Sequence, residues 1–288
     1  MLGFVTSIRA RSLARDWPRH VWMLQRTIAS MLAADNTEVI VVAHDPPELA
    51  PDPRVSVLTV DLPIPARHND AMCVDKVLKV SAGIAAMQRR GADYIGICDA
   101  DDLVSRRVSR FVHDHAGAAG WFAPIMLTYA YGGRWVKRRV MPPNEAGPFA
   151  IIRADLLHFE EPPFTGSWVG LARAGGESSY VDALAGCRRP VCPIVAGGHT
   201  RYLRLLAEVG HHLEPLPFNG HLMVNHADST STVEGGKGTS QVPSFAQIAR
   251  GMRRWLPALR PLMPSLRGDF GIPADIPRQY ADASVLWR

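Results

Sequence analysis

Residues 39–43 form an unbroken apolar run, Val-Ile-Val-Val-Ala. A strand of a parallel sheet with both faces covered reads as such a run, whereas a half-exposed strand alternates apolar and polar residues. Apolar residues recur at helical spacing before the run, over residues 21–32, and again after it, over residues 77–87. Because strands that alternate with helices build an open sheet covered on both faces, this segment constrains the fold strongly.

We therefore predict an α/β fold, with a doubly wound, mostly parallel sheet and right-handed crossovers over the first 110 residues. The expected strands there are residues 4–8, 39–43, 55–60 and 94–98. Beyond residue 110 we expect two strands around the Gly132-Gly133 turn (121–131 and 134–140), a strand at 150–153, a Gly- and Pro-rich loop over 158–198, a helix at 202–209, a strand at 221–226 and an amphipathic helix at 245–260.

Composition excludes several classes of protein. The chain has 288 residues, 47% of them hydrophobic, which excludes a disordered chain, a collagen and a coiled coil. The 32 basic and 27 acidic residues give a net charge of +5, but the basic residues are scattered, so we expect no nucleic-acid binding. Neither a secretory signal nor an apolar run of the ~18 residues that a membrane span needs is present, and four cysteines are too few for a disulfide framework. We expect a cytoplasmic protein.

Three carboxylates, Asp99, Asp101 and Asp102, directly follow the apolar strand at 94–98. Ligands of open α/β sheets bind at the carboxyl ends of strands. Carboxylates at this spacing repel one another unless a cation lies between them, and their oxygens suit Mg²⁺ or Mn²⁺. The alternative is an Asp-rich helix start, with Asp102 as the N-cap of a helix from Leu103 onward.

The segment Gly-Ala-Asp-Tyr-Ile-Gly-Ile-Cys-Asp-Ala-Asp-Asp (91–102), behind a strand, a helix, a strand and a helix, resembles the Asp-x-Asp motif region of GT-A glycosyltransferases. The resemblance covers residues 3–157 well and the remainder loosely. It extends to bacterial proteins of the "glycosyltransferase family A" type, which also open with Val-Thr-Ser-Ile-Arg and carry an Asp-Lys before the second helix, here Asp75-Lys76. It implies a GT-A (Rossmann-like) sheet flanked by helices, with a C-terminal acceptor-side subregion and a terminal helix.

The resemblance also implies three regions of the chain. Residues 1–110 would bind a nucleotide-sugar, residues 111–240 would form the acceptor-side half of the same domain, and residues 241–288 would form an amphipathic helix and tail. The implied activity is metal-dependent transfer of a sugar from a UDP- or GDP-type donor to an acceptor hydroxyl. The acceptor is open between a glycan, a lipid-linked molecule and a small molecule.

By position in the family, Asp101 would ligate Mn²⁺ or Mg²⁺ directly, and Asp99 would reach the metal or the ribose. His226 resembles a late histidine that serves as a further metal ligand; the alternative is a surface histidine in a polar loop. The metal would neutralise charge on the departing nucleotide diphosphate. The other implied donor contacts are Thr6, Ser7, Arg9, His44, Asp45, Lys76 and Lys79. Alternatively, Lys79 is a solvated helix lysine and His44 only ends a strand.

The family pattern fails at the catalytic base. Many inverting members place an Asp just before the helix at 202–209, where this chain has Gly-Gly-His-Thr over residues 197–200. Glu177, Asp182 and His199 are therefore candidate bases, with the two carboxylates slightly favoured. A retaining enzyme would need no such base, so the stereochemistry is undecided.

Three points stay open from the sequence. Trp135 and Trp168 either stack on a sugar ring or belong to the core. The helix at 245–260, with three arginines on its polar side, rests on anionic lipid at the inner membrane face or packs on the domain. The alternatives to a transferase are a non-catalytic or degenerate nucleotide-sugar-binding protein and a haloacid-dehalogenase-like phosphohydrolase, although the latter normally carries its Asp-x-Asp on the first strand. A sugar-nucleotide pyrophosphorylase is disfavoured, because no Gly-rich loop follows the first strand.

Overall fold

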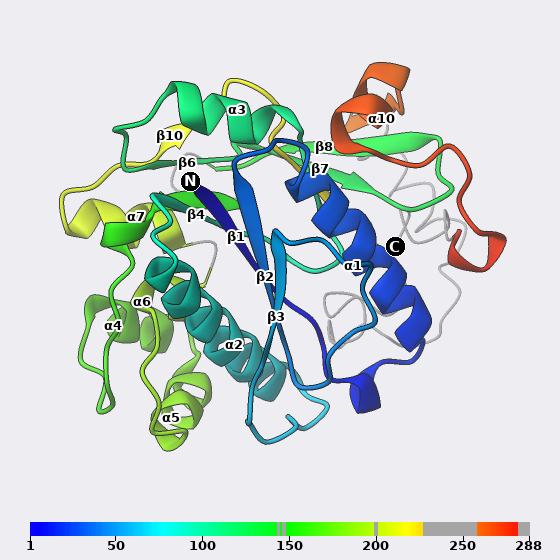
Figure 1. Cartoon of the computed structure of the whole chain (residues 1–288). Helices are drawn as coiled ribbons and strands as arrows, with labels where there is room; N and C mark the ends of the chain where they lie inside the picture. The colour runs from blue at the N-terminus through cyan, green and yellow to red at the C-terminus, as the bar shows by residue number, and fades with distance from the viewer. Residues whose placement is uncertain (143–144, 146–147, 199–200, 227–257, 282–288) are drawn as a thin grey trace, which may run out of the picture.

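The computed structural model of the chain describes residues 1–142, 145, 148–198, 201–226 and 258–281. Its centre is a seven-stranded sheet with the strand order β10-β6-β9-β4-β1-β2-β3 (Figure 1). The neighbours β4, β1, β2 and β3 are parallel to one another. Their bounds are Tyr94–Ile97, Leu2–Ser7, Thr37–Ala43 and Val55–Thr59. The other three strands are β6 (Gly120–Phe122), β9 (Ala150–Arg153) and β10 (Glu214–Pro215), of which β9 runs antiparallel to both β4 and β6.

Helices cover both faces of this sheet (Figure 1). On one face, α2 (Asn69–Arg89) packs against Ile40 and Val42 of β2. On the other face, α1 (Trp17–Met31) packs against Val39 and Val41 of the same strand. Each buried side chain of this size contributes about 1.5–3 kcal/mol, so the uninterrupted apolar run of β2 is explained by its two buried faces. The predicted mixed α/β fold with a mostly parallel central sheet flanked by helices is confirmed.

A second, five-stranded sheet has the order β12-β8-β7-β11-β5. Its strands are β5 (Leu103–Val104), β7 (Ile125–Tyr129), β8 (Trp135–Val140), β11 (His221–Val224) and β12 (Leu259–Pro261). The hairpin of β7 and β8 is closed by Gly132, whose φ of +83° favours glycine. The single strand expected at 121–131 divides at Pro124 into β6 of the large sheet and β7 of the small one, because proline has no N–H for a ladder.

The prediction of a loop over residues 158–198 is wrong. This segment holds the short helices α4 (Ser167–Ala174), α5 (Ser178–Gly186) and α6 (Pro193–Ala196), which share a hydrophobic core with α2. Each is too short to show a helical period in the sequence. The remaining elements are η1 (Arg11–Leu13), α3 (Arg107–Asp114), η2 (Ala154–Leu156), α7 (Tyr202–Glu208), α10 (Pro264–Phe270) and η5 (Arg278–Tyr280).

The interpretation of Asp102 as a helix N-cap is also wrong. Leu103 and Val104 form β5, and α3 begins only at Arg107. Of the helix expected at 245–260, residues 245–257 lie outside the described residues. Residues 259–260 belong to strand β12. The three predicted regions of the chain stay a prediction. Among the described residues, no helix has the length and apolarity needed to cross a membrane.

Candidate active site

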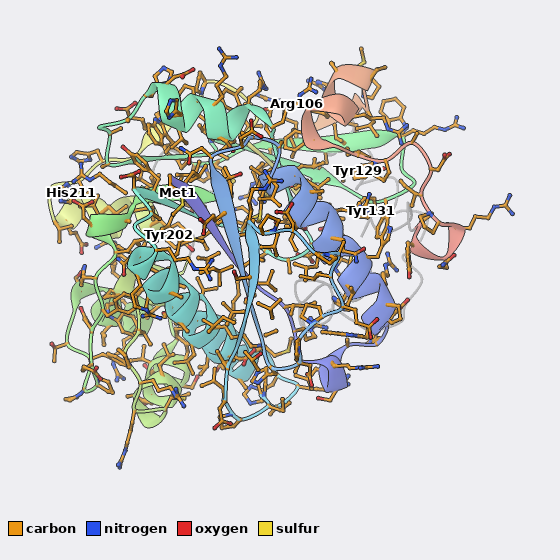
Figure 2. The ribbon with its side chains drawn as sticks, in the orientation of Figure 1. Met1, Arg106, Tyr129, Tyr131, Tyr202 and His211 are labelled. Atoms are coloured by element: carbon orange, nitrogen blue, oxygen red, sulfur yellow. The ribbon has the colours of Figure 1, made fainter. Side chains whose placement is uncertain are left out.

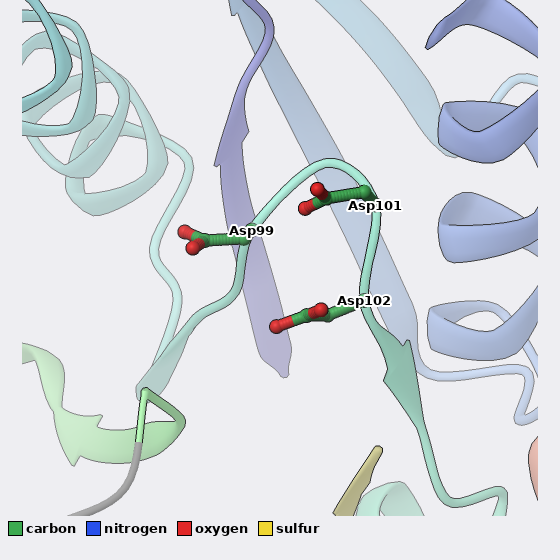
Figure 3. Close-up of side chains that lie close together, drawn as sticks. All are labelled: Asp99, Asp101 and Asp102. Atoms are coloured by element: carbon green, nitrogen blue, oxygen red, sulfur yellow. The ribbon is translucent and has the colours of Figure 1, made fainter. Parts of the chain in front are cut away.

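The loop of residues 99–102 leaves the carboxyl end of β4 and enters β5 (Figure 3). Oxygens of Asp99, Asp101 and Asp102 all lie within 4.8 Å of one another. Helix α1 holds this loop from one side, since the Thr27 hydroxyl donates to the Ala100 carbonyl at 3.0 Å. One side of the acidic loop is therefore fixed by the first crossover helix.

Lys76 of α2 pairs with Asp99, with 2.5 Å between Nζ and Oδ1. The side chains are 47% and 35% exposed, so a ligand in solvent can reach both. Loss of hydration opposes the charge on Lys76, but the charge of Asp99 and the hydrogen bond to it raise the pKa of the lysine above its usual value. Tyr202 of α7 lies on the same side of the site (Figure 2). Its pKa is raised mainly by burial, while the nearby charge of Lys76 lowers it and that of Asp99 raises it.

His226 lies beside Asp101, with 2.8 Å between Nε2 and Oδ2. The imidazole is buried, and its ring meets that of His20 edge to face at 5.6 Å. Burial alone would raise the pKa of Asp101, but the hydrogen bond and charge of His226 and the charge of His20 hold it below its usual value. Tyr131 lies on this α1 side of the molecule, where burial raises its pKa (Figure 2). The structure thus brings together two of the predicted metal ligands from distant parts of the chain.

Asp102 turns away from solvent and is 3% exposed. Its Oδ2 lies 2.9 Å from His221 Nε2, and its Oδ1 accepts the Val224 N–H at 2.8 Å. Burial raises the pKa of Asp102 to about 6, although the charge of His221 opposes the shift. The His221 ring stacks on Phe149 with 5.4 Å between centroids. Sequence reasoning missed this contact, and the sequence carries no local signal of it.

At the carboxyl ends of β1 and β2, two of the residues predicted to contact the donor, His44 and Lys79, join Asp75 in a buried network. Asp75 of α2 accepts from Lys79 Nζ at 2.7 Å and lies 2.7 Å from His44 Nε2. The Lys79 ammonium also donates to the Ile8 carbonyl at 3.0 Å. Lys79 is 1% exposed, and burial lowers its pKa, so it is not the solvated helix lysine of the alternative interpretation. The spacing of Asp75 and Lys79, four residues apart on a helix, was the available signal of their pairing.

The remaining predicted donor contacts lie near this network. Thr6 is fully buried at the end of β1, and within the described chain its hydroxyl has no hydrogen-bond partner. Ser7 and Arg9 follow it and are partly exposed. Asp45, after β2, accepts the Arg11 N–H at 2.9 Å. These residues share one edge of the sheet with the acidic loop, because β1 pairs with both β2 and β4.

Two of the candidate bases, Glu177 and Asp182, lie at α5, on the side of the molecule that also holds α7. Glu177 pairs with Arg201 at 3.0 Å, and Arg201 also donates to the Gly197 carbonyl at 2.8 Å. Asp182 pairs with Arg173 at 2.7 Å on an exposed part of α5. His199 lies outside the described residues. Both candidate carboxylates that the structure describes are therefore paired with arginines.

The two tryptophans that sequence reasoning left open have opposite environments. Trp168 is buried in α4, where its Nε1 donates to Glu160 at 3.0 Å, so it belongs to the core. Trp135, at the start of β8, is 45% exposed. Of these two rings, that of Trp135 is accessible to solvent and that of Trp168 is not.

The donor set of the acidic loop fits a hard divalent cation. Asp99 and Asp101 offer partly exposed carboxylate oxygens within reach of one another, and His226 adds an imidazole nitrogen next to Asp101. Oxygen and imidazole ligands together suit Mn²⁺ or Mg²⁺. Cationic Lys76 beside Asp99 shows that this edge already stabilises positive charge.

No family model matches the chain, and no curated protein sequence matches it. Among solved structures, the chain is similar to the crystal structure of S. aureus TarS (1–349), with 10% sequence identity and a TM-score of 0.35. The alignment covers 79% of this chain and 61% of the TarS chain, so this chain spans about three fifths of its neighbour.

Proposed function

We propose that this protein is a metal-dependent glycosyltransferase that moves a sugar from a UDP- or GDP-type donor to an acceptor hydroxyl. The observation that carries the proposal is the pairing of Asp99 with Lys76 and of Asp101 with His226 at the carboxyl edge of the sheet. That edge is where open α/β sheets bind their ligands. Two carboxylates, an imidazole and a half-exposed ammonium suit a metal-bound diphosphate.

Asp99, Asp101 and His226 are the residues that would hold Mn²⁺ or Mg²⁺. When bound, the ion supplies positive charge against the departing nucleotide diphosphate. Lys76 is half-exposed and lies on Asp99, so its ammonium can turn to a phosphate oxygen once the carboxylate binds the ion.

The donor's nucleoside would meet Thr6, Ser7 and Arg9 after β1, and His44 and Asp45 after β2. Lys79 was predicted to contact phosphate or ribose. Its contacts with Asp75 and Ile8 support a role in holding these loop ends instead.

The acceptor side would involve Glu177, Asp182 or His199 as the base that takes the proton of the acceptor hydroxyl. Arg201 would have to release Glu177 for that role, because both carboxylate oxygens of Glu177 accept hydrogen bonds from the guanidinium. A retaining mechanism needs no such group, and the anomeric configuration of the product, read by NMR, separates the two. The acceptor is a glycan, a lipid-linked molecule or a small molecule. Sedimentation with liposomes, with and without residues 241–288, tests the membrane contact proposed for residues 245–260.

The test combines ligand binding with turnover. We expect UDP- or GDP-sugars to raise the melting temperature in the presence of Mn²⁺, and chelation by EDTA to remove this effect. Asp101→Ala should abolish the metal-dependent shift. Asp155→Ala is the matched control, because Asp155 pairs with Arg153 beside the opposite, amino edge of the sheet. If no nucleotide-sugar stabilises the protein, the proposal is wrong.

A second candidate is a nucleotide-sugar-binding protein without turnover. The arginine pairing of Glu177 and Asp182 favours it, because neither carboxylate stands ready as a base. Nucleotide release distinguishes the two functions. Binding of a nucleotide-sugar with no release of nucleotide, across a panel of acceptors, would support the second candidate.

A further inference from the structure

Asp102 differs from the other two carboxylates of the acidic loop in both exposure and partners. Asp99 and Asp101 are 35% and 27% exposed, whereas Asp102 is 3% exposed. Both oxygens of Asp102 already accept hydrogen bonds or lie at hydrogen-bond distance, one with His221 and one with the Val224 N–H. Proximity alone groups the three carboxylates, but Asp102 faces strand β11 instead of solvent.

Strand β11 is the element that delivers His226 to the loop. It pairs antiparallel with β5, with His221 opposite Val104 and Leu222 opposite Leu103. On its other side β11 pairs parallel with β7, and this ladder continues past the strand, because the Asn225 N–H donates to the Tyr129 carbonyl at 2.8 Å. His226 follows directly and lies 2.8 Å from Asp101. Asp102 therefore ties the loop to the same strand whose end carries the histidine.

Helix α1 restrains the opposite side of the loop. The Val104 N–H donates to the Ser30 hydroxyl at 3.0 Å, in addition to the bond from Thr27 to Ala100. With α1 on one side and Asp102 on the other, the backbone between residues 100 and 104 is held at both ends. These contacts restrain the loop in addition to the 2.8 Å contact between Asp101 and His226 themselves.

We infer that Asp102 and His221 are positioning residues, which fix Asp101 and His226 at the spacing that a divalent cation needs and do not themselves ligate it. The inference rests on the proposed function for the metal site alone, and holds whether or not sugar is transferred. Residues that orient metal ligands typically change metal affinity by about 10–100-fold when they are removed.

The test measures Mn²⁺ binding to the full chain by isothermal titration calorimetry and by the electron paramagnetic resonance signal of free Mn²⁺. Asp101→Asn removes a ligand, so we expect at least about a 100-fold loss of affinity. In Asp102→Asn, the amide oxygen still accepts the Val224 N–H, and the amide N–H₂ can donate to His221 in its other tautomer. We therefore expect the affinity of Asp102→Asn to stay within about 3-fold of wild type, and that of His221→Ala to fall about 10-fold.

A double-mutant cycle shows through which residue His221 acts. In a His226→Ala background, we expect His221→Ala to cost clearly less than the about 10-fold that it costs in the wild type, because one of the two ligands that it positions is gone. A role in folding alone would leave the two losses independent. Circular dichroism checks each variant, and Asp102→Asn keeps the test decisive if His221→Ala does not fold.

Several results would overturn the inference. Loss of Mn²⁺ affinity in Asp102→Asn as large as in Asp101→Asn would make Asp102 a ligand. An unchanged affinity in folded His221→Ala would remove its positioning role. Absence of Mn²⁺ binding by the wild type would overturn the metal site and this inference together. Normal Mn²⁺ binding without nucleotide release would instead refute only the transferase activity.

Discussion

Lys79→Met is the sharpest test of the buried network at the ends of β1 and β2. The ammonium of Lys79 is 1% exposed and donates to Asp75 at 2.7 Å and to the Ile8 carbonyl at 3.0 Å. Methionine keeps the unbranched apolar stem but removes the charge and both hydrogen bonds. The Asp75 carboxylate then keeps its contact with His44, and the Ile8 carbonyl loses its lysine donor.

Removal of one partner from a buried ion pair costs about 3–5 kcal/mol. We expect a loss at the lower end of this range, about 3 kcal/mol, because His44 still lies 2.7 Å from Asp75 and can hydrogen-bond to its carboxylate. At about 2–4 °C per kcal/mol, the melting temperature should fall by about 6–12 °C. The double variant Asp75→Asn/Lys79→Met leaves no uncompensated carboxylate, so it should recover at least about 1 kcal/mol of this loss.

Urea denaturation of the three proteins measures the free energies of unfolding, and calorimetric titration with UDP and GDP measures nucleotide affinity. A Lys79→Met variant within about 1 kcal/mol of wild type would refute the reasoning from burial. If that stable variant also failed to bind nucleotide, the ammonium of Lys79 would act on the ligand directly, as the family resemblance implies.

Three further substitutions separate structural from ligand-binding roles. Lys76→Met should change the free energy of unfolding by less than about 1 kcal/mol, because its pair with Asp99 is half-exposed. By calorimetry it should bind Mn²⁺ more tightly, since a repelling cation is gone, and nucleoside diphosphate more weakly; a parallel loss of both would contradict this. Gly120→Ala should lower the free energy of unfolding, measured in urea, by at least about 2 kcal/mol, because the φ of Gly120 is +144° and a Cβ there would lie 2.1 Å from a β9 carbonyl oxygen. Gly170→Ala on α4 is the control: a Cβ there meets open space, so the free energy of unfolding should stay within about 1 kcal/mol of wild type. Trp168→Phe should cost at least about 1 kcal/mol, through one lost hydrogen bond and the space that the smaller ring leaves in the core, and leave nucleotide affinity unchanged; a large loss of affinity would place that ring at the ligand.

The sequence predicts the central strands well because their burial is written locally. The run at residues 39–43 and the apolar strands at 94–98 and 150–153 correspond to β2, β4 and β9. The helices of residues 167–196 escape prediction, because stretches of four to nine residues interrupted by glycine and proline show no period. Strand β5 has only two residues and exists because β11 pairs with it, so no local pattern could have revealed it.

For the candidate site too, local sequence predicts some features and leaves others to the folded structure. The acidic loop follows from a buried strand that ends in carboxylates, and Asp75 and Lys79 pair at helical spacing. The contact of Asp102 with His221 spans 119 residues, so only the folded chain shows it. The likeness to a family suggested His226 but could not show that it would meet Asp101. The burial of Asp102 and of Lys79 depends on residues far away in the chain, since Asp102 contacts His221 and Lys79 contacts Ile8.

The contact of Asp101 with His226 also has a consequence for how the protein is made. The two residues are 125 positions apart in the chain. At about 5–20 residues per second, a ribosome needs about 6–25 s to add the histidine after the aspartate. During this interval α1, β1, β2 and β4 can assemble, but the acidic loop has neither β11 nor its imidazoles, and its carboxylates repel one another. The site is therefore completed late in synthesis, and a nascent chain that ends before β11 carries an acidic loop without the strand that restrains it.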